Sequence, residues 1–579
     1  MNGPAHVVSI SVIPTSQSFP SNPRPTQSSS SSSSTTTTIT TTSPFPSSND
    51  ISFRLHRAAY LHVVNVSDCD GQEAWYPDPL IPEQDDFVLE KRNALPFFVQ
   101  TGHTQAYWVD VFVRPSVTAG RYVFTVVVET QTRTPAFIDP SISSDLSHIS
   151  SHSSASSSST ATVTALSTMN SSMTLSITVF NFTLPSNTGP SYVTAFGVSS
   201  VGILKGFYGP SWQKYVNISV HVTQQYADMA LAHRITLSNM MASDWSALAA
   251  AHVDWPGFYK RWESFIQGHD LPWGLRNASA SVFEIPPVAF DPSRPNATRT
   301  ITYWREFANL AQKYNFLSRT FDYTCDEPHD STSFQACMAR GRAVKTADKG
   351  IPVLITTEWP AAVEFGVVDL IDNMVPIINF VENAKNKCAS FPTWTFGNHR
   401  PDYDSFVEEA DKRLWWYQSC LSHGCTGGCS SATQVCNSGW PSYMLDSPAI
   451  MGRVMPWLSY LYDMGGELYW GVNYQDTLGL DSWQSIWEFG GNGDGTLTYP
   501  GTPCHIGGTT PVPIASMRLK YIRDGLEDLM YMQAAEKRRG RDTVLDIIRQ
   551  VVQNTYTYTR DNFLLLNIRD LLAAAAEEY

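Results

Sequence analysis

Residues 317–328, with the sequence LSRTFDYTCDEP, join the pattern of a buried β-strand to two adjacent carboxylates. The first seven of these residues have the apolar, aromatic and β-branched content of a strand, and residues 303–314 before them place large apolar side chains at helical spacing. Asp326 and Glu327 follow where the strand should end, and Pro328 favours an extended backbone at Glu327. The stretch therefore predicts a helix, a strand and a polar loop in that order, which is the repeating unit of an α/β fold.

The same alternation of strands and helices continues over residues 189–579. Further strand patterns occur at residues 192–198, 235–240, 351–357, 374–379, 414–417, 443–446 and 468–473. Together with the first strand they approach the count of a (β/α)8 barrel. From residue 516 onward, two apolar stripes at helical spacing predict C-terminal helices. We therefore expect an α/β protein with a TIM-like (β/α)8 catalytic barrel over residues 189–579.

Residues 51–188 show a different pattern, in which short strands alternate with turns. The segment YWVDVFV at residues 107–113 alternates in period two, and Pro115 and Gly120 separate it from the next strand pattern. Several short strands broken by turns are typical of a β-sandwich. We expect an N-terminal β-sandwich domain ahead of the barrel.

Two tracts are rich in small polar residues. Residues 1–50 contain many Pro, Ser and Thr, and a Ser-rich tract lies near residues 141–172, between two strand patterns. Such compositions bury too little apolar surface to offset their ordering entropy. The first tract is expected to be disordered and the second to be an insertion in a loop of the sandwich.

The composition bears on partners and location. The chain has 579 residues and a net charge of -14, and an acidic surface repels phosphate backbones, which argues against nucleic acid as a partner. No apolar run is long enough to span a membrane. A signal peptide is not evident, but six Asn-X-Ser/Thr sequons favour a secreted or extracellular protein: Asn65, Asn170, Asn181, Asn217, Asn277 and Asn296.

The chain has nine cysteines, and four of them crowd into residues 420–436. A Gly/Ser-rich loop stapled by one or two disulfides suits a secreted protein. The alternative is a zinc site, but Cys420, Cys425, Cys429 and Cys436 lack a paired Cys-X2-Cys spacing. Residues 490–495, GGNGDG, lack the ligand spacing of a calcium loop and predict a tight turn. Neither a metal nor a cofactor is expected.

Asp326 and Glu327 are the candidates for catalysis. Reactive groups of a barrel gather where strands end, and two neighbouring carboxylates repel each other, so that one tends to hold a proton while the other stays charged. A lone Asp-Glu-Pro can also be an ordinary polar loop.

Other strand ends carry side chains that suit a sugar, because aromatic rings stack on pyranoses while carboxylates and amides bond their hydroxyls. The candidates for sugar contact are Tyr323, Glu358, Trp416, Tyr417, Trp470 and Asn473. The alternative for each single aromatic is packing in the core, above all for Trp415 and Tyr469, since only one of two neighbouring strand residues can face the barrel axis.

Several motifs, in this order along the chain, resemble glycoside hydrolase family 123 and its uncharacterised relatives. They include YPDPL at 76–80, WVDV at 108–111, the Asp326-Glu327-Pro328 motif, LYWGVN at 468–473 and IRDGLED at 522–528. The resemblance covers most of residues 75–130 and 175–535. It implies a β-sandwich followed by a (β/α)8 barrel, and β-N-acetylgalactosaminidase activity by substrate-assisted catalysis.

By this analogy, Glu327 is the general acid and base, and Asp326 orients the 2-acetamido group that attacks the anomeric carbon. The Cys-rich insertion after Tyr417 departs from the family pattern and could reshape the pocket. The sequence therefore predicts a retaining glycoside hydrolase acting on β-linked N-acetylgalactosamine of a glycan. Two alternatives stay open: a glycosidase of different sugar specificity that pairs Glu327 with Glu358, and a lectin-like binding protein without turnover.

Overall fold

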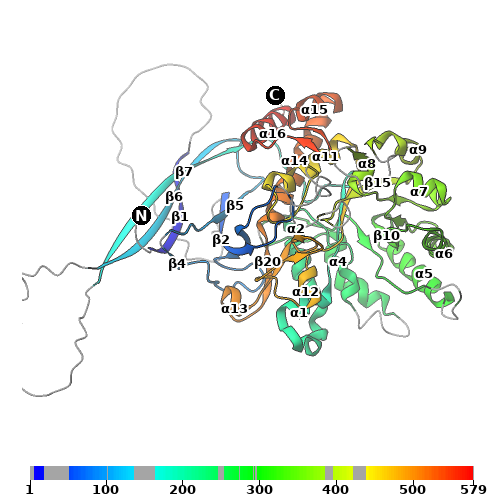
Figure 1. The fold of residues 1–579 in the computed structure, drawn as a ribbon, viewed down its shortest axis with the longest axis horizontal. Coiled ribbons are helices and arrows are strands. Elements are labelled where there is room, and N and C mark those ends of the chain that lie inside the picture. Colours follow the sequence, from blue (N-terminus) through cyan, green and yellow to red (C-terminus); the bar gives the residue numbers. More distant parts are fainter. Residues whose placement is uncertain are drawn as a thin grey trace, which may run out of the picture.

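The computed structural model describes most of the chain. The described residues are 5–17, 51–68, 70–100, 102–135, 164–244, 253–272, 274–290, 293, 297–384, 396–420, 425 and 439–577. They form a strand-rich N-terminal part that packs against an α/β barrel (Figure 1). No helix among them combines the length and the apolar content needed to cross a bilayer.

The barrel is built on a parallel sheet of seven strands. In spatial order these are β8 (Val193–Phe196), β16 (Gly466–Tyr469), β15 (Arg413–Tyr417), β12 (Asn373–Met374), β11 (Val353–Ile355), β10 (Thr320–Cys325) and β9 (Phe283–Glu284). Residues 235–238 fill the gap between the two edge strands: Leu237 forms a parallel bridge with Phe196, and the Glu284 N–H donates to Ser238 O at 2.7 Å. The ring is thereby nearly closed, and the predicted TIM-like barrel is confirmed.

Two of the predicted barrel strands are not strands of the structure. Residues 235–240 form only the isolated bridge at Leu237, and a short helical turn begins at Met240. Residues 443–446 are not a strand, because Leu445 N donates to Asn492 O in a loop. Tyr443 packs against Phe196 and Tyr469 of the barrel, while Leu445 joins a buried cluster with Leu61 and Val63 of β2. Strand β9 was not predicted, since two residues are too few to show a period.

Helices surround the barrel (Figure 1). The longer ones are α1 (Ser200–Tyr208), α2 (Ser219–Ala232), α4 (Trp255–Gln267), α5 (Ala297–Lys313), α6 (Ser331–Ala347), α11 (Ala449–Leu461), α14 (Met517–Arg539), α15 (Arg541–Ile548) and α16 (Asn562–Ala576). Shorter helices are α7 (Trp359–Glu364), α8 (Ile378–Val381), α9 (Asp404–Val407), α12 (Tyr474–Leu478) and α13 (Pro503–Ile506). Short strand pairs are β13 (Glu382–Asn383) with β14 (Gly397–Asn398), β17 (Trp487–Glu488) with β18 (Gly491–Asn492), β19 (Thr498–Gly501) with β20 (Val512–Ala515), and β21 (Val552–Asn554) with β22 (Thr557–Tyr558).

The N-terminal part consists of two antiparallel sheets. One has the order β3 (Ala74–Pro82), β2 (Ile51–Val63), β5 (Tyr107–Val113), and the other β4 (Phe97–Val99), β1 (Ala5–Gln17), β6 (Gly120–Pro135), β7 (Thr164–Val179). Phe53 of β2 and Phe124 of β6 pack edge to face at 4.8 Å between ring centroids, which joins the two sheets. This arrangement agrees with the expected β-domain.

Two expectations about the polar tracts need correction. Residues 5–17, expected to be disordered within 1–50, form strand β1, because their Val- and Ile-containing backbone pairs with both β4 and β6. Residues 164–172, expected to lie in the insertion near 141–172, belong to β7 and pair with residues 127–135 of β6. Residues 18–50 and 136–163 lie outside the described residues.

Helix α14 connects the two domains through buried ion pairs. The carboxylate of Asp110 in β5 forms ion pairs with Lys520 at 2.6 Å and Arg523 at 2.7 Å. The carboxylate of Asp78 in β3 forms an ion pair with Arg518 at 2.8 Å. Because Phe53 faces the outer sheet and Asp110 faces α14, the sheet β3-β2-β5 lies between the outer sheet and the barrel.

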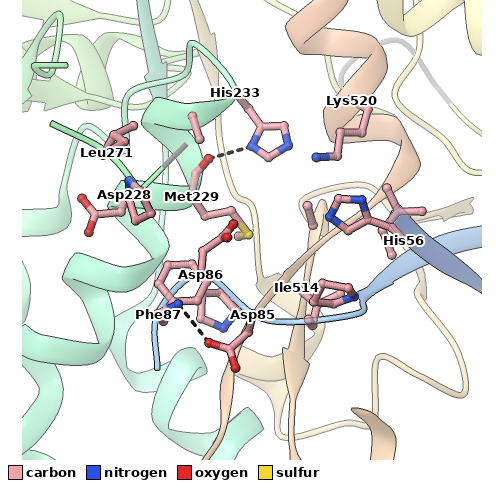
Figure 2. Close-up of a pocket in the computed structure, with 16 residues that line it drawn as sticks. His56, Asp85, Asp86, Phe87, Asp228, Met229, His233, Leu271, Ile514 and Lys520 are labelled. Carbon is pink, nitrogen blue, oxygen red and sulfur yellow. Dashed lines mark hydrogen bonds between the residues drawn. The ribbon is translucent and has the colours of Figure 1, made fainter. Parts of the chain in front are cut away.

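A small cavity of about 50 Å³ lies beside these ion pairs. Figure 2 shows His56 of β2, His233 at the end of α2 and Lys520 of α14 facing one another there. The His233 Nδ1 donates to Met229 O at 2.7 Å, because a carbonyl can only accept. Burial, followed by the charge of Lys520, lowers the pKa of His56 to about 3 and holds the pKa of His233 well below its usual value.

Acidification should therefore destabilise the interface between the domains. Below pH 6.5 the histidines of the unfolded chain bind protons, whereas folded His56 stays neutral until about pH 3, so the free energy of unfolding falls as pH falls through this window. The slope is about 1.4 kcal/mol per pH unit for each such histidine. Urea midpoints at pH 7, 6 and 5 should show a shallower pH dependence for His56→Asn than for wild type, while exposed His221→Asn keeps the wild-type slope. Equal slopes for His56→Asn and wild type would contradict the assignment.

Candidate active site

Asp326 and Glu327 lie directly after β10, at the end of the barrel where parallel strands finish. Tyr323 Oη donates to Asp326 Oδ1 at 2.8 Å, and Thr356 Oγ1 donates to the same oxygen at 3.2 Å. The Glu327 N–H in turn donates to Thr356 Oγ1 at 2.7 Å. Thr356, directly after β11, thus forms hydrogen bonds to both members of the pair. The side chains of Asp326 and Glu327 are exposed to solvent.

The backbone of Glu327 differs from the expectation. Its φ is 43°, in the left-handed region, whereas Pro328 was expected to keep it extended. A residue other than glycine adopts a positive φ only where its surroundings impose it. Such residues cluster at functional sites. At Glu327 these surroundings are the hydrogen bond from its N–H to Thr356 Oγ1 on one side and the start of α6 on the other. Helix α6 begins at Ser331, with a capping box between Asp330 and Ser333.

A disulfide joins the pair to the helix that follows it. Cys325, the last residue of β10, is bonded to Cys337 of α6, with 5.5 Å between their Cα atoms. Together with the capping box, it fixes both ends of the short loop that carries Asp326 and Glu327. This bond could not be predicted from the sequence, because a spacing of twelve residues has no characteristic partner pattern.

Tyr417 comes from the opposite part of the barrel to meet the pair. Its Oη donates to Glu327 Oε1 in a short hydrogen bond. Burial, and then the charge of Glu327, hold the pKa of Tyr417 well above its usual value, so the hydroxyl keeps its proton and remains a donor. The predicted contact residue Tyr417 therefore lies at the pair itself.

Tyr323 and Glu358 also lie with the pair. The pKa of Tyr323 is held well above its usual value by burial and then by Asp326. Burial raises the pKa of Glu358, and the charge of Glu327 raises it further. A carboxyl with this behaviour is suited to hold a proton near a charged neighbour.

Two predicted contact residues are placed elsewhere. Trp416 is fully buried and its Nε1 donates to Ser459 Oγ at 3.0 Å, because strand alternation turns it toward helix α11 while Tyr417 faces the axis. Asn473 uses its amide on the backbone of Ser199, accepting from the N–H at 2.9 Å and donating to the carbonyl at 2.9 Å. Trp416 is thus a core residue, and Asn473 fixes the loop after β16 to the start of α1.

Trp470 is partly exposed at the end of β16. Its Nε1 donates to Asp494 Oδ1 at 3.2 Å, and its ring packs edge to face against Tyr474 and Phe489. Gly495 lies under the ring at φ 68°, where an added Cβ would come within 2.3 Å of Trp470. Glycine at position 495 therefore allows the backbone of this turn to pass close to the ring. Trp470 stays a candidate for sugar contact.

The Cys-rich loop contains at least one disulfide. Cys420 and Cys425 are bonded, with Cα atoms 4.8 Å apart, so these two sulfurs cannot serve as thiolate ligands of a zinc ion. Cys429 and Cys436 lie outside the described residues. Cys420 N donates to Asp494 Oδ2 at 3.1 Å, which ties this loop to the neighbourhood of Trp470.

Comparisons with known proteins agree with this geometry. Residues 378–535 match the family model of the glycoside hydrolase 123 catalytic domain. A family 123 glycoside hydrolase from Clostridium perfringens, described in connection with glycolipid glycan hydrolysis, shares the fold with a TM-score of 0.55 at 10% identity, over 99% of this chain and 89% of that one. The chain thus resembles family 123, and the matches support glycoside hydrolase activity.

Two further solved structures are more distant. An FMN-binding β-glucuronidase from Facaelibacterium prausnitzii L2-6 has a TM-score of 0.28 at 11% identity, over 82% of this chain and 61% of that one. A β-galactosidase, described as putative, from Bacteroides fragilis has a TM-score of 0.20 at 10% identity, over 72% of this chain and 50% of that one. No curated protein matches the sequence.

Proposed function

We propose that this chain is a retaining glycoside hydrolase that removes β-linked N-acetylgalactosamine from a glycan or glycoconjugate by substrate-assisted catalysis. The observation that carries the proposal is the contrast between the two adjacent carboxylates. Asp326 accepts hydrogen bonds from Tyr323 and Thr356, whereas Glu327 accepts one from Tyr417 on the other side of the barrel. Neighbours in sequence are thus oriented for different tasks.

The spacing of the pair favours this mechanism over one with an enzyme nucleophile. A retaining enzyme with its own nucleophile needs two carboxyls on opposite sides of the scissile bond, about 5 Å apart, whereas a substrate that supplies the nucleophile needs only one acid. In the first step the acetamido oxygen attacks the anomeric carbon while Glu327 gives its proton to the departing oxygen. Asp326 accepts a hydrogen bond from the acetamido N–H and stabilises the positive charge that develops there.

In the second step the roles of acid and base reverse. Glu327, now a carboxylate, takes a proton from water as the water oxygen attacks the anomeric carbon, and the bond to the acetamido oxygen breaks. Two inversions at this carbon return the original configuration. Tyr417 keeps Glu327 oriented through both steps, and Tyr323 and Trp470 provide aromatic surface for the sugar.

A sugar panel tests the proposal. The wild-type protein should hydrolyse an aryl β-N-acetylgalactosaminide and leave the aryl β-galactoside, which lacks the acetamido group, essentially untouched. Replacing the acetyl by a trifluoroacetyl group should slow the reaction strongly, because the attacking oxygen becomes a weaker nucleophile. Equal activity on sugars with and without the acetamido group would overturn the substrate-assisted mechanism.

One rival is favoured by a specific observation. The pKa of Glu358 is raised partly by Glu327, so Glu358 could act as an acid beside a charged Glu327 in ordinary two-carboxylate chemistry. That enzyme would hydrolyse the plain galactoside and would lose activity in Glu358→Gln. Binding of the sugar without turnover would instead favour a lectin-like protein. The two described disulfides and the sequons support a secreted location for any of these.

A further inference from the structure

Glu284 carries a carboxyl group at a strand end that none of the steps above uses. It is the last residue of β9, in register with Phe321 of β10. Phe283 beside it packs against Phe316, with ring centroids 5.8 Å apart, and Phe316 contacts Phe307 of α5. Phe283 therefore faces the helices, and strand alternation turns Glu284 toward the barrel axis.

The register partner of Glu284 confirms this direction. Phe321 packs edge to face against Trp415 of β15, which is not a neighbouring strand, so the contact crosses the barrel interior. Asp322 points the other way, toward α6. Its two carboxylate oxygens accept hydrogen bonds from Nη2 and Nε of Arg340, at 2.7 and 2.9 Å. The next residue of β10 on the axis side is Tyr323, which bonds Asp326 at 2.8 Å. Glu284 and the catalytic pair thus lie on one inward-facing surface.

Glu284 is also without a bonding partner among the residues that the structure describes. Across the described part of the chain, its side chain makes neither a hydrogen bond nor an ion pair. The titratable groups that interact with it are Asp322 and Tyr323 of β10 and Arg340 of α6, and the one cation among them is engaged by Asp322. Burial, and then the charge of Asp322, raise the pKa of Glu284 to about 8, so the group is an uncharged acid at neutral pH.

We propose that Glu284 contacts the sugar held at Asp326 and Glu327, donating a hydrogen bond from its protonated carboxyl to a hydroxyl oxygen of that sugar. An unpartnered donor on the same inward-facing surface as a catalytic pair gains its missing bond when an oxygen-rich ligand arrives there. A carboxylic acid kept neutral can donate this bond, whereas a carboxylate cannot. The inference rests on the proposed function and adds a residue that determines affinity for the sugar ring.

The test is the pH dependence of binding, which needs no catalytic acid. Calorimetry with N-acetylgalactosamine between pH 5.5 and 9.5 should show a wild-type Kd that rises as pH passes about 8, where Glu284 loses its proton. Glu284→Gln keeps an uncharged donor of the same shape, so its Kd should stay within about threefold of wild type at pH 6.5 and be flat with pH. Glu284→Ala should bind about 10- to 100-fold more weakly at every pH.

Glu306→Ala, on the outer helix α5, serves as the matched control and should bind like wild type at every pH. Wild-type affinity in Glu284→Ala would overturn the inference, and so would a Glu284→Gln variant that keeps the wild-type pH dependence or binds as weakly as the alanine variant. Any of these results with an enzyme active on the acetamido substrate leaves the proposed function standing. A wild type that neither hydrolyses that substrate nor binds the sugar removes both.

Discussion

Glu327→Gln should lower kcat for an aryl β-N-acetylgalactosaminide by about 10²–10⁴-fold, because the amide can neither give a proton to the departing oxygen nor take one from water. The loss should depend on the leaving group. A dinitrophenyl group departs without protonation, so its release should be slowed far less than that of a poorer leaving group such as an alkyl alcohol. Asp326→Asn should lower kcat by a similar factor for every leaving group, since its proposed contact is with the acetamido N–H.

Two variants separate this effect from a general disturbance of the site. Glu364→Gln makes the same chemical change at an exposed position of α7 and should leave kcat unchanged. Glu358→Gln should retain most activity if the proposed roles hold. Full activity in folded Glu327→Gln, checked by a thermal melt, would show that the acid has been assigned to the wrong residue.

The barrel was predictable because its longer strands have the apolar and β-branched content of buried strands. Residues 192–198, 317–323, 351–357 and 414–417 overlap strands β8, β10, β11 and β15, whose apolar content reflects burial on both faces. The same content misled at residues 443–446, a loop whose Tyr443 packs against barrel aromatics and whose Leu445 packs against β2 of the N-terminal domain. Strand β1 could not be read from composition, since its order comes from pairing with β4 and β6, far away in sequence.

The site was predictable in part. Asp326 and Glu327 could be located because they end a strand, and Tyr417 because it ends another. Whether Trp416 or Tyr417 faces the axis depends on the phase of alternation, which the sequence of one strand leaves open. Glu284 could not be recognised as a site residue from the sequence, because its position depends on the register of a two-residue strand.

Asp110→Ala should lower the free energy of unfolding by about 3–5 kcal/mol, because it leaves buried cations without their counter-charge. Asp110 is 2% exposed and joins Lys520 and Arg523 of α14 to the sheet of the N-terminal domain. Burial already lowers the pKa of Lys520 to about 8, and Asp110 opposes that effect. Without the carboxylate, the ammonium group should lose its proton within the neutral range, so the loss of stability should be smaller at pH 8 than at pH 6.

Urea unfolding followed by tryptophan fluorescence measures the effect, and two variants bracket it. Asp110→Asn keeps the shape and part of the hydrogen bonding, so its midpoint should fall between those of wild type and Asp110→Ala. Asp270→Ala removes the partner of Arg276 on the surface, where both side chains are more than half exposed at 65% and 53%, and should leave the midpoint unchanged, since exposed pairs contribute little. If Asp110→Ala unfolded at the same urea concentration as Asp270→Ala, the ion pairs of Asp110 with Lys520 and Arg523 would add nothing to stability and would only set the orientation of the two domains.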